Sequence, residues 1–105
     1  LANAVILPIV LEDYGAAAEE KLARLAEITG TKTTGTAHEK SAAFIAEIRA
    51  MNSRMGIPEH LDVICEKDIP QMVAWALREA NPTYPVPVLY DEAHCAEVIR
   101  RVRGE

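Results

Sequence analysis

Residues 1–11 constrain the fold more than any other stretch, because Asn3 is the only polar side chain among these eleven residues. A segment that is apolar on every side must be covered by protein or by lipid. Eleven residues are too few to span a bilayer, which takes about 20, and the basic leader of a secretion signal is missing. We therefore expect a central core element that later segments cover. Because a terminus normally lies at the surface, we also expect the chain to be the tail of a longer protein.

Two structures suit this first segment. The β-branched residues Val5, Ile6, Ile9 and Val10 favour a buried strand, whereas the length of the segment and its alanines favour a buried helix. Pro8 would interrupt a central strand and would kink a helix by removing one hydrogen bond. The residue pattern leaves both alternatives open. We predict a kinked helix because the later segments all have helical patterns.

The composition indicates a single all-α domain. The 105 residues include 50% hydrophobic ones, mostly aliphatic, and only 5% aromatic ones, which favours helices packed on helices. A net charge of −5 argues against a nucleic-acid partner. Cys65 and Cys95 form no CxxC pair and are interpreted as free thiols in a reducing compartment. No membrane-spanning stretch is present, so we predict a cytoplasmic protein without membrane contact.

Local signals then divide the chain into about five helices in an irregular, orthogonal bundle. Helices are predicted over residues 16–29, 36–55, 68–80 and 91–103, with Thr36 and Asp91 as N-caps. Gly30, Gly56 and Gly104 stand where left-handed residues end helices. A proline-rich strap is predicted over residues 81–87. The residues expected to face inward are Ala18, Leu22, Leu25, Ala26, Ile28, Phe44, Ile45, Ile48, Met51, Met55, Leu61, Val63, Ile64, Met72, Val73, Ala76, Leu77, Cys95, Val98, Ile99 and Val102.

The side chains that could do chemistry form no recognisable site. His38, His60 and His94 are the only imidazoles, and no two have the spacing of a metal-binding helix. We interpret them as solvated or locally hydrogen-bonded. His94 and Cys95 are neighbours in a helix and therefore diverge. No glycine-rich phosphate loop is present. We consequently predict no catalytic, cofactor-binding or metal-binding residue in this chain.

Four short motifs in a fixed order resemble the C-terminal helical domain of the iron-containing (group III) alcohol dehydrogenases. Residues 1–8 resemble the helix that follows the last metal-ligand histidine of that family. Residues 51–58 resemble the helix end at its Gly-Ile-Pro turn, and residues 68–72 the next helix start. Residues 81–87 resemble the Asn-Pro strap before the last helix. The resemblance covers the whole chain, but only about the last quarter of a family member.

The resemblance implies that residues 1–105 are a partial domain of the dehydroquinate synthase-like helical fold, without the nucleotide-binding domain and the metal-ligand helices. The parent would be a metal-dependent, NAD- or NADP-linked alcohol dehydrogenase that interconverts a small alcohol and its aldehyde or ketone. It would use iron, or zinc in some members, held by one Asp and three His upstream of Leu1. This chain would form one wall of the metal and substrate pocket and be inactive alone, with no cofactor of its own.

The chain departs from the family pattern at two positions. Ile9 stands where many relatives have a histidine, and Leu77 stands where some have a cysteine facing the pocket. Leu77 and Asn81 are therefore our candidate pocket-lining residues. The partners implied by the resemblance are the remainder of the parent polypeptide, a small alcohol or aldehyde, and a second copy in a homo-oligomer.

Two other hypotheses stay open on the sequence alone. The chain could be a non-enzymatic helical interaction or interface module that binds neither NAD nor iron. It could also be an independent interaction protein of the helical-bundle kind, which would require a natural start close to Leu1.

Overall fold

The computed structural model describes residues 2–80 and 86–105. Within these ranges every regular element is a helix and none is a strand, which confirms the all-α prediction. The elements are α1 (Ala2–Tyr14), the 3₁₀ turn η1 (Gly15–Ala18), α2 (Glu19–Ile28), α3 (Ala37–Arg54), the 3₁₀ turn η2 (Glu66–Asp68), α4 (Ile69–Ala80) and α5 (Glu92–Arg103).

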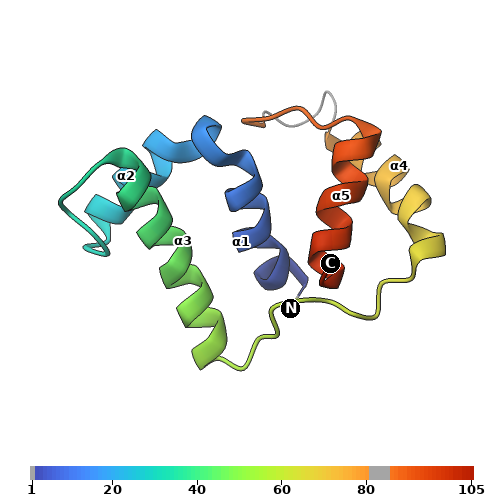
Figure 1. The fold of residues 1–105 in the computed structure, drawn as a ribbon, viewed down its shortest axis with the longest axis horizontal. Coiled ribbons are helices and arrows are strands. Elements are labelled where there is room, and N and C mark those ends of the chain that lie inside the picture. The colour runs from blue at the N-terminus through green and yellow to red at the C-terminus, as the bar shows by residue number, and fades with distance from the viewer. Residues whose placement is uncertain (1, 81–85) are drawn as a thin grey trace.

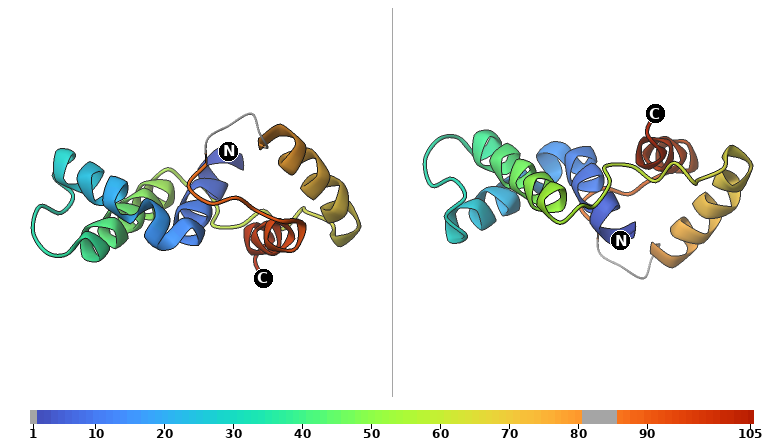
Figure 2. Two further views of the ribbon diagram at one scale, coloured as in Figure 1. Left: turned by 90° about the horizontal axis from the view of Figure 1, so that it is seen from above. Right: turned by 90° about the horizontal axis from the view of Figure 1, so that it is seen from below.

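The helices form a flat, irregular bundle with α1 in its middle. Figure 1 shows α2 and α3 on one side of α1, and α5 with α4 on the other side. The molecule measures 44 × 32 × 20 Å along its principal axes, and the views from above and below show how shallow it is (Figure 2). A connector without long helices runs from the end of α3 to α4 beneath α1 and α5 (Figure 1).

The first segment is a helix, so the alternative of a buried strand is wrong. α1 is continuous from Ala2 to Tyr14 and has Pro8 in its interior. Val5, Pro8 and Ile9 are buried, whereas Leu7 is half exposed. The segment is therefore covered on most sides but not on all of them. An interior proline is costly in a helix, and we infer that burial of the surrounding aliphatic side chains outweighs this cost.

Three apolar clusters connect the helices. Val5 and Ile9 of α1 pack with Val98 and Val102 of α5. The second cluster joins α2 to α3 and consists of Ala18, Leu22 and Ile45. The third joins α4 to α5 and consists of Ile69, Val73 and Cys95. Tyr90 packs against both the first and the third cluster, so the segment before α5 connects the two.

The predicted helix ends are confirmed where their hydrogen bonds are seen. The Glu39 N–H donates to Thr36 Oγ1 over 3.1 Å, and the His94 N–H donates to Asp91 Oδ1 over 2.7 Å. Gly30, Gly56 and Gly104 have the positive φ values expected after a helix. α4 begins directly after Asp68 and ends before Asn81, close to the predicted range 68–80, and it has Pro70 in its first turn.

Several predicted core positions are wrong. Leu25, Ile28, Met51, Met55, Val63 and Ala76 are exposed. α2 contacts α3 through small residues, since Ala23 and Ala26 are buried beside Leu22, and this turns Leu25 and Ile28 outward. Two contacts place α2 over the beginning of α3: a hydrogen bond between His38 and Glu19 and an ion pair between Lys40 and Glu27. The last turns of α3 therefore extend beyond α2, which leaves Met51 and Met55 uncovered.

Asn81 and most of the predicted strap, residues 81–85, lie outside the described residues. None of the described helices is long and apolar enough to cross a membrane.

Two valines that differ in burial allow a test of how the core contributes to the free energy of unfolding. Val5 is 1% exposed in the first cluster and Val63 is 81% exposed in the connector. We expect Val5→Ala to lower the free energy of unfolding by about 1.5–3 kcal/mol, through lost burial and the cavity left behind. Val63→Ala should change it by less than about 0.5 kcal/mol. Urea unfolding followed by helical circular dichroism measures both, and equal effects would contradict this account of the core.

Candidate functional site

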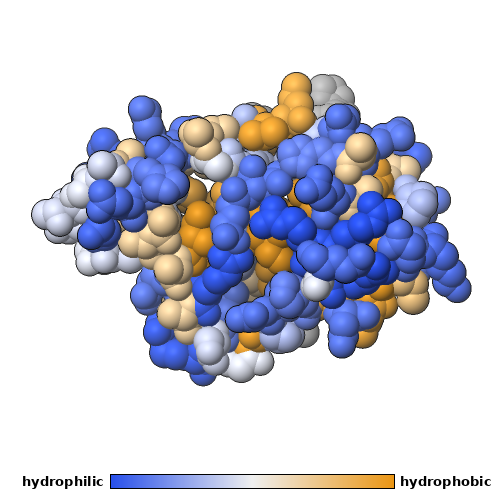
Figure 3. Space-filling model, viewed as in Figure 1, coloured by the Kyte–Doolittle hydropathy of each residue, from blue (hydrophilic) through white to orange (hydrophobic). Residues whose placement is uncertain are grey.

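An apolar cleft lies between α1, α4 and α5 and has a volume of about 350 Å³. Leu77, one of the two residues proposed from the sequence to line a pocket, lies in its wall. Its lining also includes Ile6, Val10, Tyr14, Met72, Ala76, Val86, Val88, Tyr90, Cys95, Val98, Ile99 and Val102. In the space-filling view, hydrophobic side chains stay visible between polar ones through the middle of the molecule (Figure 3).

Helical periodicity places these side chains in the cleft. Ile6, Val10 and Tyr14 follow each other at intervals of four along α1 and therefore share one face. Val98 and Val102 repeat the same interval on α5. α1 is apolar around most of its surface, so it can supply one face to α3 and another to the cleft.

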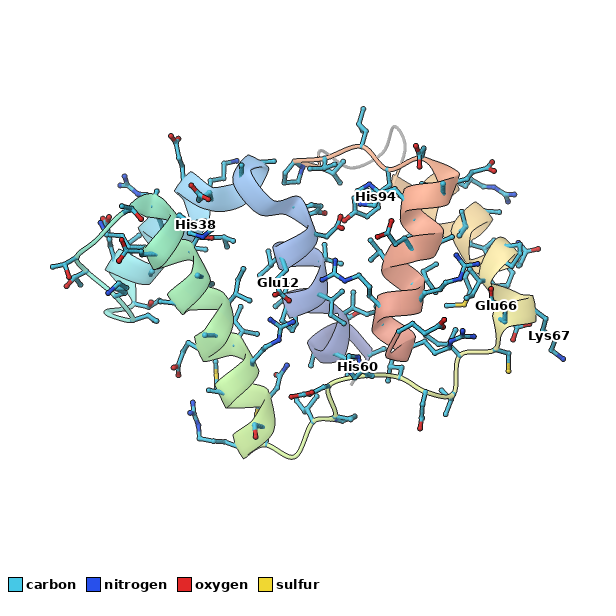
Figure 4. The ribbon with its side chains drawn as sticks, viewed as in Figure 1. Glu12, His38, His60, Glu66, Lys67 and His94 are labelled. Carbon is cyan, nitrogen blue, oxygen red and sulfur yellow. The ribbon has the colours of Figure 1, made fainter. Side chains whose placement is uncertain are left out.

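A cluster of charged and aromatic side chains joins α1 to α5 beside this cleft. Asp13, whose side chain is only 12% exposed, lies at the end of α1. His94 Nε2 is 2.8 Å from Asp13 Oδ2, and Arg101 Nη1 is 3.4 Å from Asp13 Oδ1. The view with side chains shows His94 reaching from α5 toward α1 (Figure 4). Two basic side chains from one face of α5, His94 and Arg101, therefore hold one carboxylate of α1.

Two tyrosines complete the cluster and also line the cleft. The ring of Tyr90 is tilted over His94 with 4.4 Å between centroids, and Tyr14 lies 6.1 Å from Tyr90. Burial and the neighbouring Asp13 carboxylate raise the pKa of Tyr90 well above its usual range. The phenol thus stays protonated, and it can donate a hydrogen bond to Asp13.

These contacts shift the pKa values of both Asp13 and His94. Burial acts to raise the pKa of Asp13, but the neighbouring Tyr90 hydroxyl, the hydrogen bond with His94 and the charges of His94 and Arg101 outweigh it, so that the pKa is lowered. The hydrogen bond to Asp13 raises the pKa of His94. No local sequence signal predicts the contact between Asp13 and His94, because the two residues are 81 positions apart. The prediction that His94 is solvated or locally hydrogen-bonded is wrong, because its side chain contacts Asp13 of another helix.

The other groups singled out from the sequence do not meet at one site. His38 Nδ1 contacts Glu19 Oε2 at 3.1 Å on the far side of the molecule. His60 Nδ1 lies 3.2 Å from the Arg101 carbonyl oxygen. Burial raises the pKa of the Cys95 thiol, which makes it a weak nucleophile. Among residues 2–80 and 86–105, no three His, Cys, Asp or Glu side chains come together as a metal site.

The arginines near the C-terminus, Arg100, Arg101 and Arg103, form ion pairs with other segments of the chain. Arg100 and Arg103 both pair with Glu66 in η2, at 2.8 and 3.0 Å, while Arg101 turns to Asp13 on the other side. Glu12 pairs with Arg49 of α3. Figure 4 shows Glu12 on α1 in the middle of the molecule and Glu66 beside the beginning of α4. Exposed pairs of this kind contribute about 0–1 kcal/mol each, so they orient helices more than they stabilise them.

The Asp13–His94 pair predicts a specific pH dependence. Because the pKa of His94 is raised in the fold, its contribution is complete below the ordinary histidine pKa and is lost as pH rises through the raised value. Because the pKa of Asp13 is lowered, its contribution is present above the ordinary aspartate pKa and is lost as pH falls through the lowered value. We expect His94→Gln to flatten the decline in stability on the alkaline side of about pH 6.5.

The matched control for this prediction is Asp13→Asn, which removes the charge that raises the pKa of His94. It should flatten the same alkaline decline in the free energy of unfolding, measured by urea titration at pH 5–9. A decline that persists unchanged in Asp13→Asn would show that this pair is not its source.

Comparison with known proteins identifies the chain. The family described as Fe-containing alcohol dehydrogenase family, C-terminal, matches residues 1–102. The chain is 36% identical over 104 residues to a 1,3-propanediol dehydrogenase of Citrobacter freundii and to one of Klebsiella pneumoniae. Each match covers 96% of this chain, and the chain spans 27% of the length of each relative. No solved structure matches it. These matches confirm the resemblance found in the motifs, and the chain belongs to the Fe-containing alcohol dehydrogenase family, within its C-terminal region.

Proposed function

We propose that this chain is the C-terminal helical part of a metal-dependent alcohol dehydrogenase that uses NAD or NADP. The parent would interconvert a small alcohol and its aldehyde or ketone by hydride transfer. The observation that carries the proposal is the family match over residues 1–102, supported by 36% identity to two 1,3-propanediol dehydrogenases. The name of those relatives favours a small, diol-like alcohol as the substrate class.

The chemical groups of the reaction would come from the rest of the parent. A bound divalent metal, iron or zinc, would supply a Lewis acid for the substrate oxygen, and the nicotinamide would exchange the hydride. The described residues of this chain do not assemble a metal site, so we assign them no ligand and no step at the metal. The nucleotide-binding domain and the ligand-bearing helices would precede residue 1, and this chain alone would be inactive.

The part that we assign to this chain is one wall of the substrate pocket. Leu77 lies on α4 in the wall of an apolar cleft of about 350 Å³, a size within the usual range of small-molecule sites. An apolar wall excludes water from the reacting centre and limits the size of the substrate. We propose Asn81 as a second lining residue because it follows α4 directly in the sequence.

Exposed apolar side chains suggest that other protein covers part of this surface in the intact protein. Leu7, Trp75 and Leu89 are 46%, 60% and 76% exposed, and exposed apolar side chains often mark an interface where they are contiguous. We propose that the remainder of the parent covers part of this surface, and that a second copy in a homo-oligomer covers another part. The same observation favours the alternative function, a non-enzymatic interface module. Two free cysteines, Cys65 and Cys95, support a cytoplasmic location.

The proposed activity can be tested on the complete gene product. We expect the full-length protein, loaded with Fe²⁺ or Zn²⁺, to reduce NAD⁺ or NADP⁺ with 1,3-propanediol or another small alcohol, measured by nicotinamide absorbance. A chelator should abolish the activity and added metal should restore it. Calorimetric titration of the 105-residue chain with NAD⁺ or Fe²⁺ should give no binding heat. A full-length protein that is inactive with every small alcohol and either metal would favour the interface module instead.

The lining role of Leu77 can be tested in the full-length enzyme. Leu77→Ala should enlarge the apolar wall, raise KM for the smallest alcohols and shift the preference toward longer ones. One lost methylene contact changes kcat/KM by about 10-fold or more in a closely fitted apolar site. Arg78→Ala is the matched control, because Arg78 is exposed on the same helix, and it should leave the preference unchanged. An equal shift in both variants would argue against a lining role for Leu77.

A further inference from the structure

The interior proline of α1 leaves one backbone carbonyl without its usual partner. In an α-helix the carbonyl of residue i accepts the N–H of residue i+4, so Ala4 would pair with residue 8. Residue 8 is Pro8, which lies inside the helix and has no N–H. Ala4 is itself partly buried, and a buried carbonyl without a donor is costly. The first turn of α1 therefore needs a donor from elsewhere.

Asn52 of α3 supplies that donor. Its Nδ2 donates to the Ala4 carbonyl oxygen over 2.8 Å in a partly buried contact, although the two residues are 48 positions apart. The local structure holds Asn52 in place, because its own carbonyl accepts the Ile57 N–H over 2.9 Å just after the end of α3 at Arg54. Only a side chain with a terminal donor can make this bond, and an aspartate in the same place would present acceptors alone.

We propose that Asn52 is a positioning residue that replaces the hydrogen bond removed by Pro8 and thereby fixes the first turn of α1 against α3. The bond orients the turn through which polypeptide upstream of residue 1 would enter this bundle. That second consequence rests on the proposed function, in which the catalytic groups precede α1. The bond itself and its coupling to Pro8 do not depend on it.

If the contribution of Asn52 to stability depends on Pro8, that dependence distinguishes the positioning role of Asn52 from ordinary packing. If Asn52 stands in for a missing N–H, restoring that N–H must make Asn52 dispensable. Pro8→Ala returns an amide hydrogen to residue 8, which can then donate to the Ala4 carbonyl within the helix. A side chain that only fills space would be worth the same in either background.

The experiment is a double-mutant cycle on the 105-residue chain with Asn52→Ala, Pro8→Ala and the double variant. We expect Asn52→Ala alone to raise the equilibrium constant for unfolding about tenfold, since a buried acceptor loses its donor. In the Pro8→Ala background the same change should raise it less than about twofold. Urea unfolding gives the constants, and Ser53→Ala, an exposed neighbour on α3, is the control with an expected change below about twofold.

A local measurement keeps the proposal testable if one variant is too unstable for the cycle. Amide hydrogen exchange at Ile6 and Leu7, whose N–H groups belong to the first turns of α1, should accelerate about tenfold in Asn52→Ala relative to Val98 in the core. In the double variant it should return to the rate of Pro8→Ala. If Asn52→Ala does not fold, folding of the double variant supports the proposal, and its failure while Pro8→Ala folds overturns it.

The outcomes separate this proposal from the proposed function. An equal cost of Asn52→Ala in both backgrounds would show a packing role and overturn the positioning role, whatever the full-length enzyme does. A large coupling together with a full-length protein inactive toward alcohols would leave the positioning of α1 intact and reject the dehydrogenase assignment.

Discussion

The burial of α1 between two helix pairs is the interaction on which the rest of this structure depends. α2 packs with α3 and α4 packs with α5, and both pairs contact α1 through α3 and α5 (Figure 1). Val5 and Ile9 are buried against α5, and Leu11 and Tyr14 pack against the cluster of α2 and α3. Each such side chain contributes about 1.5–3 kcal/mol when fully buried, whereas an exposed ion pair contributes about 0–1 kcal/mol. Apolar burial therefore holds the two halves together.

Polar contacts decide how α1 is oriented once it is buried, because apolar burial is not directional. Asn52 of α3 holds the beginning of α1 at the Ala4 carbonyl. Near its end, Glu12 pairs with Arg49 of α3, while Asp13 faces His94 and Arg101 of α5. These contacts occupy both ends and both sides of the helix. A rotation or a slide of α1 would break several of them at once, which makes one arrangement preferable to its neighbours.

The sequence predicted local structure well and contacts between helices poorly. Thr36, Asp91 and the glycines at helix ends act through hydrogen bonds within a few residues, so their signals are local. Which stripe of a helix is buried depends on where its partner lies, and α2 covers only the beginning of α3. Met51 is exposed for that reason, and Leu25 is exposed because α2 packs through its alanines, so both core predictions are wrong. The Asp13–His94 and Ala4–Asn52 contacts span 81 and 48 residues, and no spacing rule reaches so far.

The same contacts bear on what this chain contributes to an enzyme. Its three histidines all face groups of the chain itself: Asp13, Glu19 and the Arg101 carbonyl. Its polar side chains thus serve to place helices, and what α1, α4 and α5 enclose is an apolar space that includes Leu77. In the proposed function such a space acts by shape, since an apolar wall discriminates substrates by the volume that it leaves. The accuracy of that shape then depends on the orientation of α1, which connects the Asn52 amide to substrate preference through packing alone.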